Sequence, residues 1–240
     1  MRRVVDPIFA EPRLAEVYDP LDPDRSDLDA YVAVVEEFGA RSVLDIGCGT
    51  GTFACLLARR GCSVTAVDPA GASLAVARAK PGAERVRWVH GYATDLPPLQ
   101  VDLVTMTANV AQVFLTDAAW DSTLQAAYAA LRPGGRLVFE TRDPAARAWL
   151  EWNREHSHQR TVVPGVGGVQ AWHELLEVSG DLVSFRTTVS TDQTLADIRR
   201  SGLEHIFRKL PPIQVCDARH ADGLPPIYTA KPCARREPTE

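Results

Sequence analysis

An apolar segment that runs directly into three closely spaced glycines constrains this chain more than any other feature. Residues 43–51 read Val-Leu-Asp-Ile-Gly-Cys-Gly-Thr-Gly, and a second apolar segment ends at Asp68. A strand that ends in a glycine-rich turn and opens a helix lets the backbone approach a ligand where a Cβ would collide, and it points unpaired N–H groups at that ligand. A carboxylate at the end of the next strand can accept hydrogen bonds from both hydroxyls of a ribose. The pattern predicts a site for a nucleoside-bearing cofactor.

The spacing of the glycines distinguishes between cofactors. A dinucleotide fingerprint needs Gly-x-Gly-x-x-Gly, but the third glycine here is Gly51 and the position that the fingerprint requires is Thr52. Residues 44–51 instead resemble the first motif of the class I S-adenosylmethionine-dependent methyltransferases. In that family this turn holds the methionine half of the cofactor. A nicotinamide oxidoreductase stays as the enzymatic alternative, weakened by Thr52.

Apolar segments alternate with helical patterns along the first 140 residues. Short apolar runs predict strands, apolar residues at helical spacing predict the helices between them, and Ser26 with Asp29 has the pattern of a capping box. This order predicts an α/β fold, a Rossmann-like, doubly wound and mostly parallel sheet with helices on both faces. The expected strands are 42–46, 63–67, 86–89, 101–106 and 136–141, and the expected helices lie near 28–38, 53–57, 74–78 and 120–131.

Polar residues follow all five predicted strands, and ligands in such sheets bind outside the carboxyl ends of the strands. The family resemblance implies that Asp68 binds the ribose hydroxyls, although a helix-capping aspartate before Pro69 is the alternative. It also implies that the backbone N–H of Ala93 meets the adenine ring. Tyr92 stands where the family usually has an acidic residue, and Asp95 could compensate. The predicted cofactor-binding residues are Asp45, Gly47, Cys48, Gly49, Asp68, Pro69, Ala93, Thr94, Asp95 and Thr107.

The resemblance implies methyl transfer, in which much of the protein's task is to align two reactants and exclude water. No catalytic residue is therefore assigned. If the acceptor must lose a proton, the candidate bases near the rim are His90, Asp143, His156 and His158. The His156-x-His158 pair lacks a suitably spaced carboxylate, so no metal site is predicted. Cys48 is expected to contribute its backbone N–H rather than its thiol, because no neighbouring base is evident.

The loop after the fourth predicted strand bears on the acceptor. Enzymes of this family that methylate exocyclic amines of bases often have Asn-Pro-Pro-Tyr there, whereas residues 107–110 read Thr-Ala-Asn-Val. An enzyme acting on adenine N6 of DNA or RNA is therefore disfavoured. Asn109 either orients the substrate or caps the loop through its side chain.

The chain divides by pattern into four parts. They are an N-terminal helical segment (1–41), a cofactor-binding core (42–143), a helix and β-hairpin that could cover the substrate (144–194), and an atypical C-terminal segment expected to be irregular (195–240). In the third part, Asp143-Pro144 starts a helix bearing Trp149 and Trp152, and residues 169–178 and 182–189 form the hairpin around Gly180-Asp181.

The C-terminal segment departs from the family pattern of a helix followed by two strands. Residues 195–208 have the apolar spacing of a helix, but six of the 17 prolines fall after it. Proline removes ladder donors, so little room remains for two regular strands, and the fifth strand would be left at an exposed edge. Together with Tyr92, this tail motivates a further alternative, a cofactor-binding protein without turnover.

Composition and charge restrict the kinds of molecule that the chain is expected to bind. The 240 residues carry a net charge of -5, which disfavours a large nucleic-acid footprint and favours a small-molecule methyl acceptor. The N-terminus lacks an apolar signal-peptide stretch, and no run approaches membrane-spanning length. The five cysteines are odd in number and include no Cys-x-x-Cys pair, as expected of reduced thiols. A cytoplasmic protein without a membrane partner is predicted.

Overall fold

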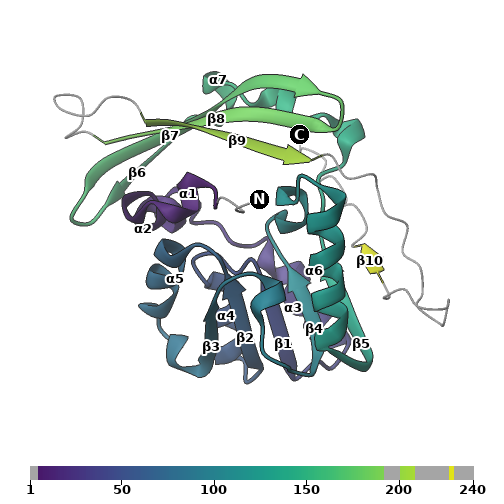
Figure 1. The fold of residues 1–240 in the computed structure, drawn as a ribbon. Coiled ribbons are helices and arrows are strands. Elements are labelled where there is room, and N and C mark those ends of the chain that lie inside the picture. Colours follow the sequence, from purple (N-terminus) through teal and green to yellow (C-terminus); the bar gives the residue numbers. More distant parts are fainter. Residues whose placement is uncertain (1–4, 192–200, 209–226, 230–240) are drawn as a thin grey trace, which may run out of the picture.

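The computed structural model describes residues 5–191, 201–208 and 227–229, which form two layers with a pair of N-terminal helices between them (Figure 1). The lower layer in Figure 1 is a sheet flanked by helices, and the upper layer is an antiparallel sheet. In the part of the chain that the structure describes, no helix combines the length and the apolar character needed to cross a membrane.

The lower layer confirms the predicted doubly wound α/β fold. Its strands have the order β10-β5-β4-β1-β2-β3, and every neighbouring pair is parallel. Parallel neighbours require crossover connections, which the intervening helices supply. The strands are β1 (Ser42–Ile46), β2 (Ser63–Asp68), β3 (Val86–His90), β4 (Val101–Met106), β5 (Leu131–Phe139) and β10 (Ile227–Thr229).

Neighbouring residues of the central strands enter opposite halves of the core. Val43 and Leu103 pack with the helices α3, α4 and α5, whereas Leu44 and Val104 pack with α6. Because successive side chains of a strand point to opposite faces, a strand covered on both faces must be apolar throughout, and this made these strands recognisable. The helices are α3 (Leu28–Glu37), α4 (Thr52–Arg59), α5 (Gly71–Arg78) and α6 (Asp117–Ala130).

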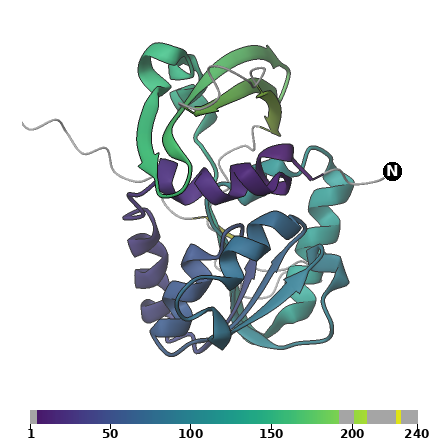
Figure 2. The same cartoon turned by 90° about the vertical axis from the view of Figure 1, so that its left-hand side faces the viewer.

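Two N-terminal helices lie between the layers, as Figures 1 and 2 show. They are α1 (Pro7–Ala10) and α2 (Pro12–Leu21), and α2 contacts α5 on one side and the strands β6 and β7 on the other. Val17 of α2 packs against Val163 and Val169 of the upper sheet, and the Ser73 hydroxyl of α5 donates to the Phe9 carbonyl at 3.0 Å. These contacts fix the upper layer over the carboxyl ends of the core strands.

The upper layer, called the cover sheet below, is antiparallel with the order β6-β7-β8-β9. The predicted hairpin is confirmed as its central pair, which turns at Gly180 with a φ of +53° and contains a bulge between Leu175 and Glu177. The strands are β6 (Gln159–Val163), β7 (Gly167–Ser179), β8 (Leu182–Thr191) and β9 (Ser201–Arg208).

The predicted helix over residues 195–208 is wrong where the structure describes it. Ser201–Arg208 is the strand β9, which pairs antiparallel with β8 along its length, from Ser201 opposite Val189 to Arg208 opposite Leu182. The remaining residues of that prediction, 195–200, lie outside the described residues. A short apolar pattern is compatible with either structure, and the backbone groups along the open edge of β8 favour the strand.

The expectation that the fifth strand has an exposed edge is also wrong. Ile227–Thr229, directly after Pro225-Pro226, forms β10 and pairs in parallel with Leu137–Phe139 of β5. Prolines at the start of a short edge strand remove no ladder donor from the residues that follow them. The edge of β5 is therefore covered over these three positions.

Three local predictions need smaller corrections. The helix expected after Asp143 is instead two 3-10 turns, η4 (Pro144–Ala146) and η5 (Ala148–Glu151), followed by a short helix, α7 (Arg154–Ser157). Strand β5 begins at Leu131 rather than at residue 136, with a register shift opposite Val101 and Leu103. The capping box is absent, because the Asp29 N–H is bonded to the backbone oxygen of Ser26 and α3 begins at Leu28.

Candidate functional site

The glycine-rich turn between β1 and α4 needs glycine for conformation and for space. Gly47, Gly49 and Gly51 all have left-handed backbones, with φ of +72°, +53° and +75°. A Cβ on Gly47 would lie 2.6 Å from the Val110 side chain, and one on Gly51 would lie 2.5 Å from Trp88. No atom lies within 4 Å of a Cβ built on Gly49. Two of the glycines thus allow close packing, and the middle one faces open space that a ligand can use.

Asp68 at the end of β2 holds the middle of this turn. Its carboxylate accepts the Gly49 N–H at 2.8 Å and the Ala70 N–H at 2.7 Å. Burial raises the pKa of Asp68, and these two backbone hydrogen bonds oppose the shift. Each carboxylate oxygen can accept more than one hydrogen bond, so the group can cap the start of α5 and still receive a hydroxyl. Both sequence interpretations of Asp68 are compatible with this geometry.

Asp45 on the neighbouring strand is the most unusual titratable group of the site. Its side chain is 1% exposed, and Oδ1 accepts the Thr105 hydroxyl at 3.0 Å. Oδ2 is buried without a hydrogen-bond partner. Burial raises the pKa of Asp45 to about 7, the hydrogen bond from Thr105 opposes the shift, and the Asp68 carboxylate adds to it. Such an oxygen is suited to a cationic or hydrogen-bonding ligand, which would relieve the cost of its burial.

The adenine-side residues form a compact turn after β3. Ala93 is buried, whereas Thr94 and Asp95 are exposed within the 3-10 turn η2 (Ala93–Asp95). The Asp95 carboxylate accepts the Tyr92 N–H at 2.8 Å and so fixes the turn itself. If Asp95 also takes the place of the acidic residue that the family usually has at position 92, its carboxylate must accept hydrogen bonds both from Tyr92 and from the adenine amino group.

The loop after β4 is tied to the loop after β5. Thr107 is buried, and Ala108 and Asn109 have left-handed backbones with φ of +57° and +63°. The backbone N–H of Asn109 donates to Glu140 Oε1 at 3.0 Å. The side chain of Asn109 makes no capping hydrogen bond to this turn, so the interpretation that Asn109 caps the loop through its side chain is wrong. Asparagine suits the position because it tolerates the left-handed conformation better than most residues.

Gln112 links three segments at this rim and was missed in the sequence. It is 1% exposed in the 3-10 turn η3 (Val110–Val113). Its Oε1 accepts the backbone N–H and the Nη1 of Arg142, each at 3.1 Å, and its Nε2 donates to the Arg208 carbonyl at 3.1 Å. The loops after β4 and β5 and the end of β9 are thus held together by one side chain. The only signal of Gln112 in the sequence is that a polar residue stands among the apolar residues Val110, Ala111 and Val113.

Asp19 of α2 was also missed, and it fastens the N-terminal helices to the glycine-rich turn. Its carboxylate accepts the Thr50 hydroxyl at 2.7 Å and forms an ion pair with Lys80. Lys80 also donates to the Thr52 hydroxyl at 2.7 Å. No local pattern identifies such a residue, because its partners lie 31 or more positions away in sequence.

The four candidate bases do not meet at one place. His90 lies at the end of β3 with Nε2 3.1 Å from the Pro69 carbonyl, and the exposed Asp143 caps η4 by accepting the Ala145 N–H. His156 is exposed on α7, and His158 contacts Gln170 and the ring of Trp172 in the cover sheet. Among the described residues, no group of three or more His, Cys, Asp or Glu side chains is placed to hold a metal ion.

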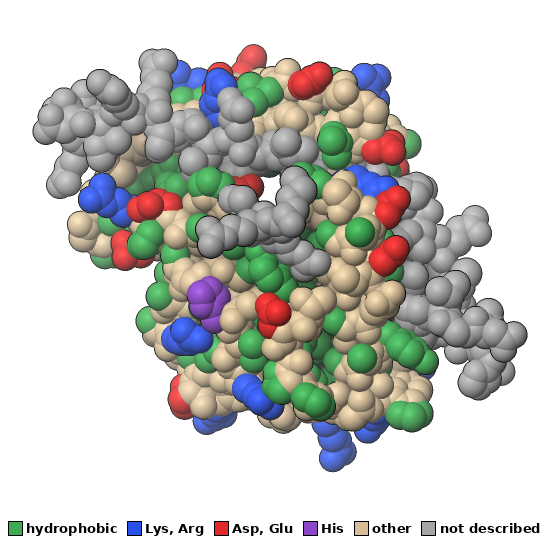
Figure 3. Space-filling model, in the orientation of Figure 1, with side chains coloured by type: hydrophobic (Ala, Val, Ile, Leu, Met, Phe, Trp, Pro, Cys, Tyr) green, Lys and Arg blue, Asp and Glu red, His purple; other side chains and the backbone are tan. Residues whose placement is uncertain are grey.

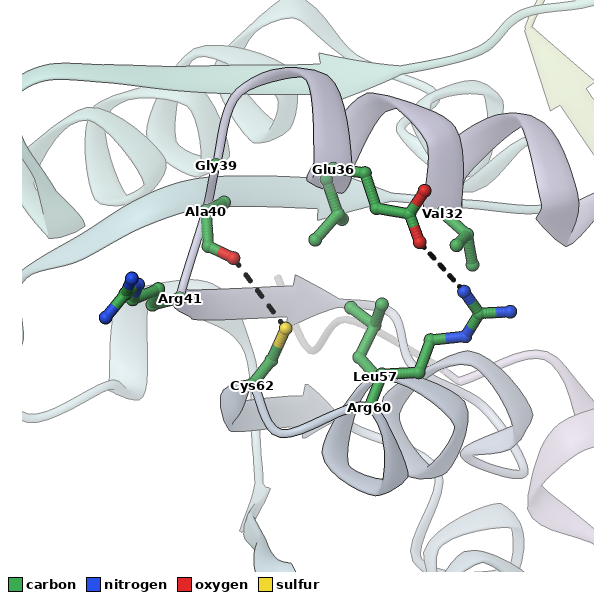
Figure 4. A pocket seen from close by; sticks show the side chains of 9 residues that line it. Val32, Glu36, Gly39, Ala40, Arg41, Leu57, Arg60 and Cys62 are labelled. Carbon is green, nitrogen blue, oxygen red and sulfur yellow. Dashed lines mark hydrogen bonds and ion pairs between the residues drawn. The ribbon is translucent and has the colours of Figure 1, made fainter.

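Two surface pockets open on the part of the molecule that the structure describes, one far from the glycine-rich turn and one beside the start of α4. One, of about 240 Å³, opens at the amino end of β1 between Glu36, Arg60 and Cys62, where the Arg60–Glu36 ion pair spans 3.0 Å (Figure 4). The other, of about 290 Å³, lies beside Asp19 and Lys80. Ligands of doubly wound sheets bind at the carboxyl ends of the strands, so the glycine-rich turn remains the candidate site.

Comparison with known proteins gives one family and several relatives. The profile of a family described as a methyltransferase domain matches residues 43–135. The cypemycin N-terminal methyltransferase of a Streptomyces species is 31% identical over 166 residues, which cover 68% of this chain and 66% of that protein. The ubiquinone biosynthesis O-methyltransferase of Azotobacter vinelandii is 35% identical over 116 residues, covering 46% of this chain and 48% of that protein. The chain thus spans between about half and two thirds of these two relatives.

Solved structures share the fold. The sugar N-methyltransferase KedS8 from Streptoalloteichus sp ATCC 53650 has a TM-score of 0.67 at 20% identity, covering 88% of this chain and 82% of that one. An S-adenosylmethionine-dependent methyltransferase from Clostridium acetobutylicum has a TM-score of 0.64 at 20% identity, covering 83% and 82%. The matches cover most of both chains, so the likeness includes part of the cover layer as well as the core.

Proposed function

This chain belongs to the class I S-adenosylmethionine-dependent methyltransferases, and on that premise we propose that it transfers a methyl group from S-adenosylmethionine to a small-molecule acceptor. The proteins named above are, by their names, an N-terminal methyltransferase of cypemycin, an O-methyltransferase of ubiquinone biosynthesis and a sugar N-methyltransferase. Their diversity supports a small acceptor without naming it. Three free cysteines among the described residues and the acidic net charge support a cytoplasmic location without a nucleic-acid partner.

One observation carries the proposal: two buried carboxylates and an open glycine lie together at the ends of β1 and β2. Asp68 accepts the Gly49 N–H, and Asp45 keeps one buried oxygen without a partner. S-adenosylmethionine supplies a methyl carbon activated by a sulfonium charge, and it also carries an ammonium group and a ribose. The residues present fit this group, because the carboxylates suit its positive charges and hydroxyls and Gly49 leaves room for it.

The protein's own residues divide the work as follows. The N–H groups of Gly47 and Cys48 bond the Val67 carbonyl and that of Gly49 bonds Asp68, so the turn would offer the methionine part close backbone approach and not the expected Cys48 N–H donor. Asp45 would face positive charge, and Asp68 would bind ribose hydroxyls. Ala93, Thr94 and Asp95 would border the adenine, Pro69 would lie beside it, and Thr107 would border the reacting side. The cover sheet and α2 would exclude water from the site. Exclusion of water strengthens electrostatic interactions there and helps to keep the two reactants aligned.

Calorimetric titration with S-adenosylmethionine, S-adenosylhomocysteine and NAD tests the proposal. Both adenosyl ligands should bind the wild type, NAD should not, and Asp68→Asn should weaken binding at least about tenfold, since a charged acceptor is lost. Asp102→Asn serves as the control, because Asp102 binds the N–H groups of Arg41 and Ser42 at the other end of the strands. Silence toward both adenosyl ligands from a folded wild type would refute the proposal.

A further inference from the structure

In the described part of the chain, two buried side-chain oxygens lack a hydrogen-bond partner. One is Oδ2 of Asp45, which the proposed function assigns to positive charge. The other is the hydroxyl of Tyr31 on α3, a residue that is only 5% exposed. A buried polar group without a partner costs free energy, so its presence in a folded protein needs an explanation. The Tyr31 hydroxyl is therefore a candidate ligand-binding group that the cofactor residues named above do not include.

Tyr31 and Asp45 belong to the same face of the core sheet. Successive side chains of a strand point to opposite faces, so Asp45 lies on the face of Val43. By the same alternation Glu140, the residue after β5, continues the face of Val138. Val43, Val138 and Tyr31 pack in one cluster, which α3 and α4 cover. The Tyr31 side chain is therefore brought to the ends of β1 and β5, where the two carboxylates also lie.

The electrostatic neighbours of Tyr31 agree with this placement. Burial raises the pKa of the Tyr31 hydroxyl, and the carboxylates of Glu140, Asp45 and Asp27 raise it further, in that order. The hydroxyl thus stands in negative surroundings, although no hydrogen bond of acceptable geometry joins it to Glu140. A group with several N–H donors and a positive charge would satisfy the hydroxyl and the nearby carboxylates together.

Glu140 is the more accessible part of this cluster. Its side chain is partly exposed, and Oε1 accepts the Asn109 N–H at 3.0 Å. Burial lowers the pKa of Arg142 and the Glu140 carboxylate opposes this shift, so the nearby guanidinium favours the ionised form of Glu140. A carboxylate can accept several hydrogen bonds, so Glu140 can receive a ligand while it holds the loop. Figure 3 shows the surface hollowed between the two layers, on the side to which the carboxyl ends of the core strands point.

The order of the strands fits the length of the adenosyl cofactor. Strands β1 and β4 lie between β2 and β5, so the backbones that carry Asp68 and Glu140 are about 14 Å apart. In the cofactor a chain of six bonds joins the ribose ring to the α-nitrogen, and it spans about 7 Å when extended. The two side chains and their hydrogen bonds bridge the remainder. A ribose held by Asp68 would therefore bring the α-amino group toward Glu140 and Tyr31.

We propose that Tyr31 and Glu140, beside Asp45, bind the α-ammonium group of the adenosyl cofactor and select for it over the α-carboxylate. The ammonium has three N–H donors and a positive charge, so it can serve all three side chains at once. The same side chains repel a carboxylate. The inference rests on the proposed function, because it concerns one end of the same cofactor, and it assigns a specificity-determining role to Tyr31 and Glu140.

Calorimetric titration with S-adenosylhomocysteine, its decarboxylated analogue and its deaminated analogue tests the inference. The wild type should bind the decarboxylated analogue nearly as tightly as the parent and the deaminated analogue at least about tenfold more weakly, because only the ammonium makes charge-assisted hydrogen bonds here. Glu140→Gln should weaken binding of the parent and of the decarboxylated analogue about tenfold, without weakening that of the deaminated analogue. Tyr31→Phe should show the same pattern with losses of about threefold.

Melting temperatures of the ligand-free proteins separate binding from structure. Tyr31→Phe removes a hydroxyl that has no partner in the described part of the chain, so it should not lower the melting temperature. A lowered melting temperature together with equal losses for all three ligands would show a structural role and overturn the inference. The controls are Tyr128→Phe, at a 53% exposed position of α6, and Glu36→Gln, whose carboxylate pairs with Arg60 near the amino end of β1. Both should leave all three affinities unchanged.

Two further ligands distinguish the ways in which the inference can fail. Sinefungin carries an amine in place of the transferred methyl group. If it binds more tightly than S-adenosylhomocysteine and Glu140→Gln abolishes that preference, Glu140 receives the amine of an acceptor and the inference is overturned. Methylthioadenosine lacks the amino-acid end. If the wild type binds it but binds the decarboxylated and deaminated analogues equally, only the inference fails, whereas a folded wild type that binds no adenosyl ligand refutes the proposed function and the inference with it.

Discussion

Replacing Asp45 by Asn should make the protein more stable at neutral and alkaline pH. Burial raises the folded-state pKa from its ordinary 3.8 to about 7, so the folded protein keeps a proton that the unfolded chain has released. The contribution of Asp45 to the free energy of unfolding therefore falls as pH rises from about 4 to about 7, and it is constant above that pH. At 1.36 kcal/mol per unit the penalty approaches about 4 kcal/mol above pH 7. Between pH 5 and pH 8 it grows by about 3 kcal/mol.

Asn keeps an acceptor for the Thr105 hydroxyl but buries an amide NH₂, which costs about 1–3 kcal/mol at every pH. The change of the stability difference with pH is therefore the quantity to measure. Urea unfolding followed by circular dichroism at pH 5, 6, 7 and 8 gives that difference for Asp45→Asn against wild type. The gap should move in favour of the variant by about 3 kcal/mol across this range.

Asp102→Asn provides a control of opposite sign. Although burial opposes it, the backbone N–H groups of Arg41 and Ser42 lower the pKa of Asp102. Its stabilising contribution is complete above the unfolded pKa and is lost only as pH falls through the lower folded pKa. The difference in free energy of unfolding between wild type and Asp102→Asn should then be constant from pH 5 to pH 8. Parallel stability curves for Asp45→Asn and wild type would show that Asp45 is ionised throughout, and the burial argument would be refuted.

Three further predictions concern the same region. Affinity for S-adenosylmethionine should rise with pH up to about 7 and then stay constant, because the ligand's positive charge favours ionised Asp45. Calorimetry in two buffers of different ionisation enthalpy should show that binding near pH 6 releases protons, and binding without proton release would contradict the prediction. Gly47→Ala should destabilise the protein by about 1–2 kcal/mol or more, because the left-handed backbone and the Val110 side chain at 2.6 Å both oppose a Cβ. Adding Val110→Ala to this variant should recover only the part of the loss that comes from the clash with Val110, as measured by thermal unfolding. Gln112→Ala should cost about 1–3 kcal/mol in urea unfolding, because it removes the hydrogen bonds that the buried Gln112 side chain makes to Arg142 and to the Arg208 carbonyl, and a cost below about 0.5 kcal/mol would count against that role.

The core sheet could be predicted because its signals are local. The strands Ser42–Ile46 and Val101–Met106 have the predicted bounds. A parallel strand covered on both faces is a short continuous apolar run, and glycines or an Asp-Pro pair mark where it ends. The glycine-rich turn was recognisable for the same reason, since backbone conformation at Gly47, Gly49 and Gly51 depends on the residue itself.

The segment 201–208 shows where local signals are insufficient. Its apolar spacing is compatible with a helix, yet it is a strand because β8 presents an unpaired edge there. The short strand after Pro225-Pro226 forms for a similar reason at the edge of β5. Hydrogen bonding between segments distant in sequence decided both, and no window of neighbouring residues contains that information.

The same division applies to the candidate site. The residues alone were enough to predict a strand, a glycine turn and an acidic strand end in that order, and the assignment of those residues to cofactor binding stays a prediction. Packing between distant segments is what buries Asp45 with an unpartnered oxygen, makes Gln112 join three segments and brings His173 beside Trp152. Burial, hydrogen bonding and ring contacts depend on distances between residues far apart in the chain. These quantities exist only once the two layers have packed together.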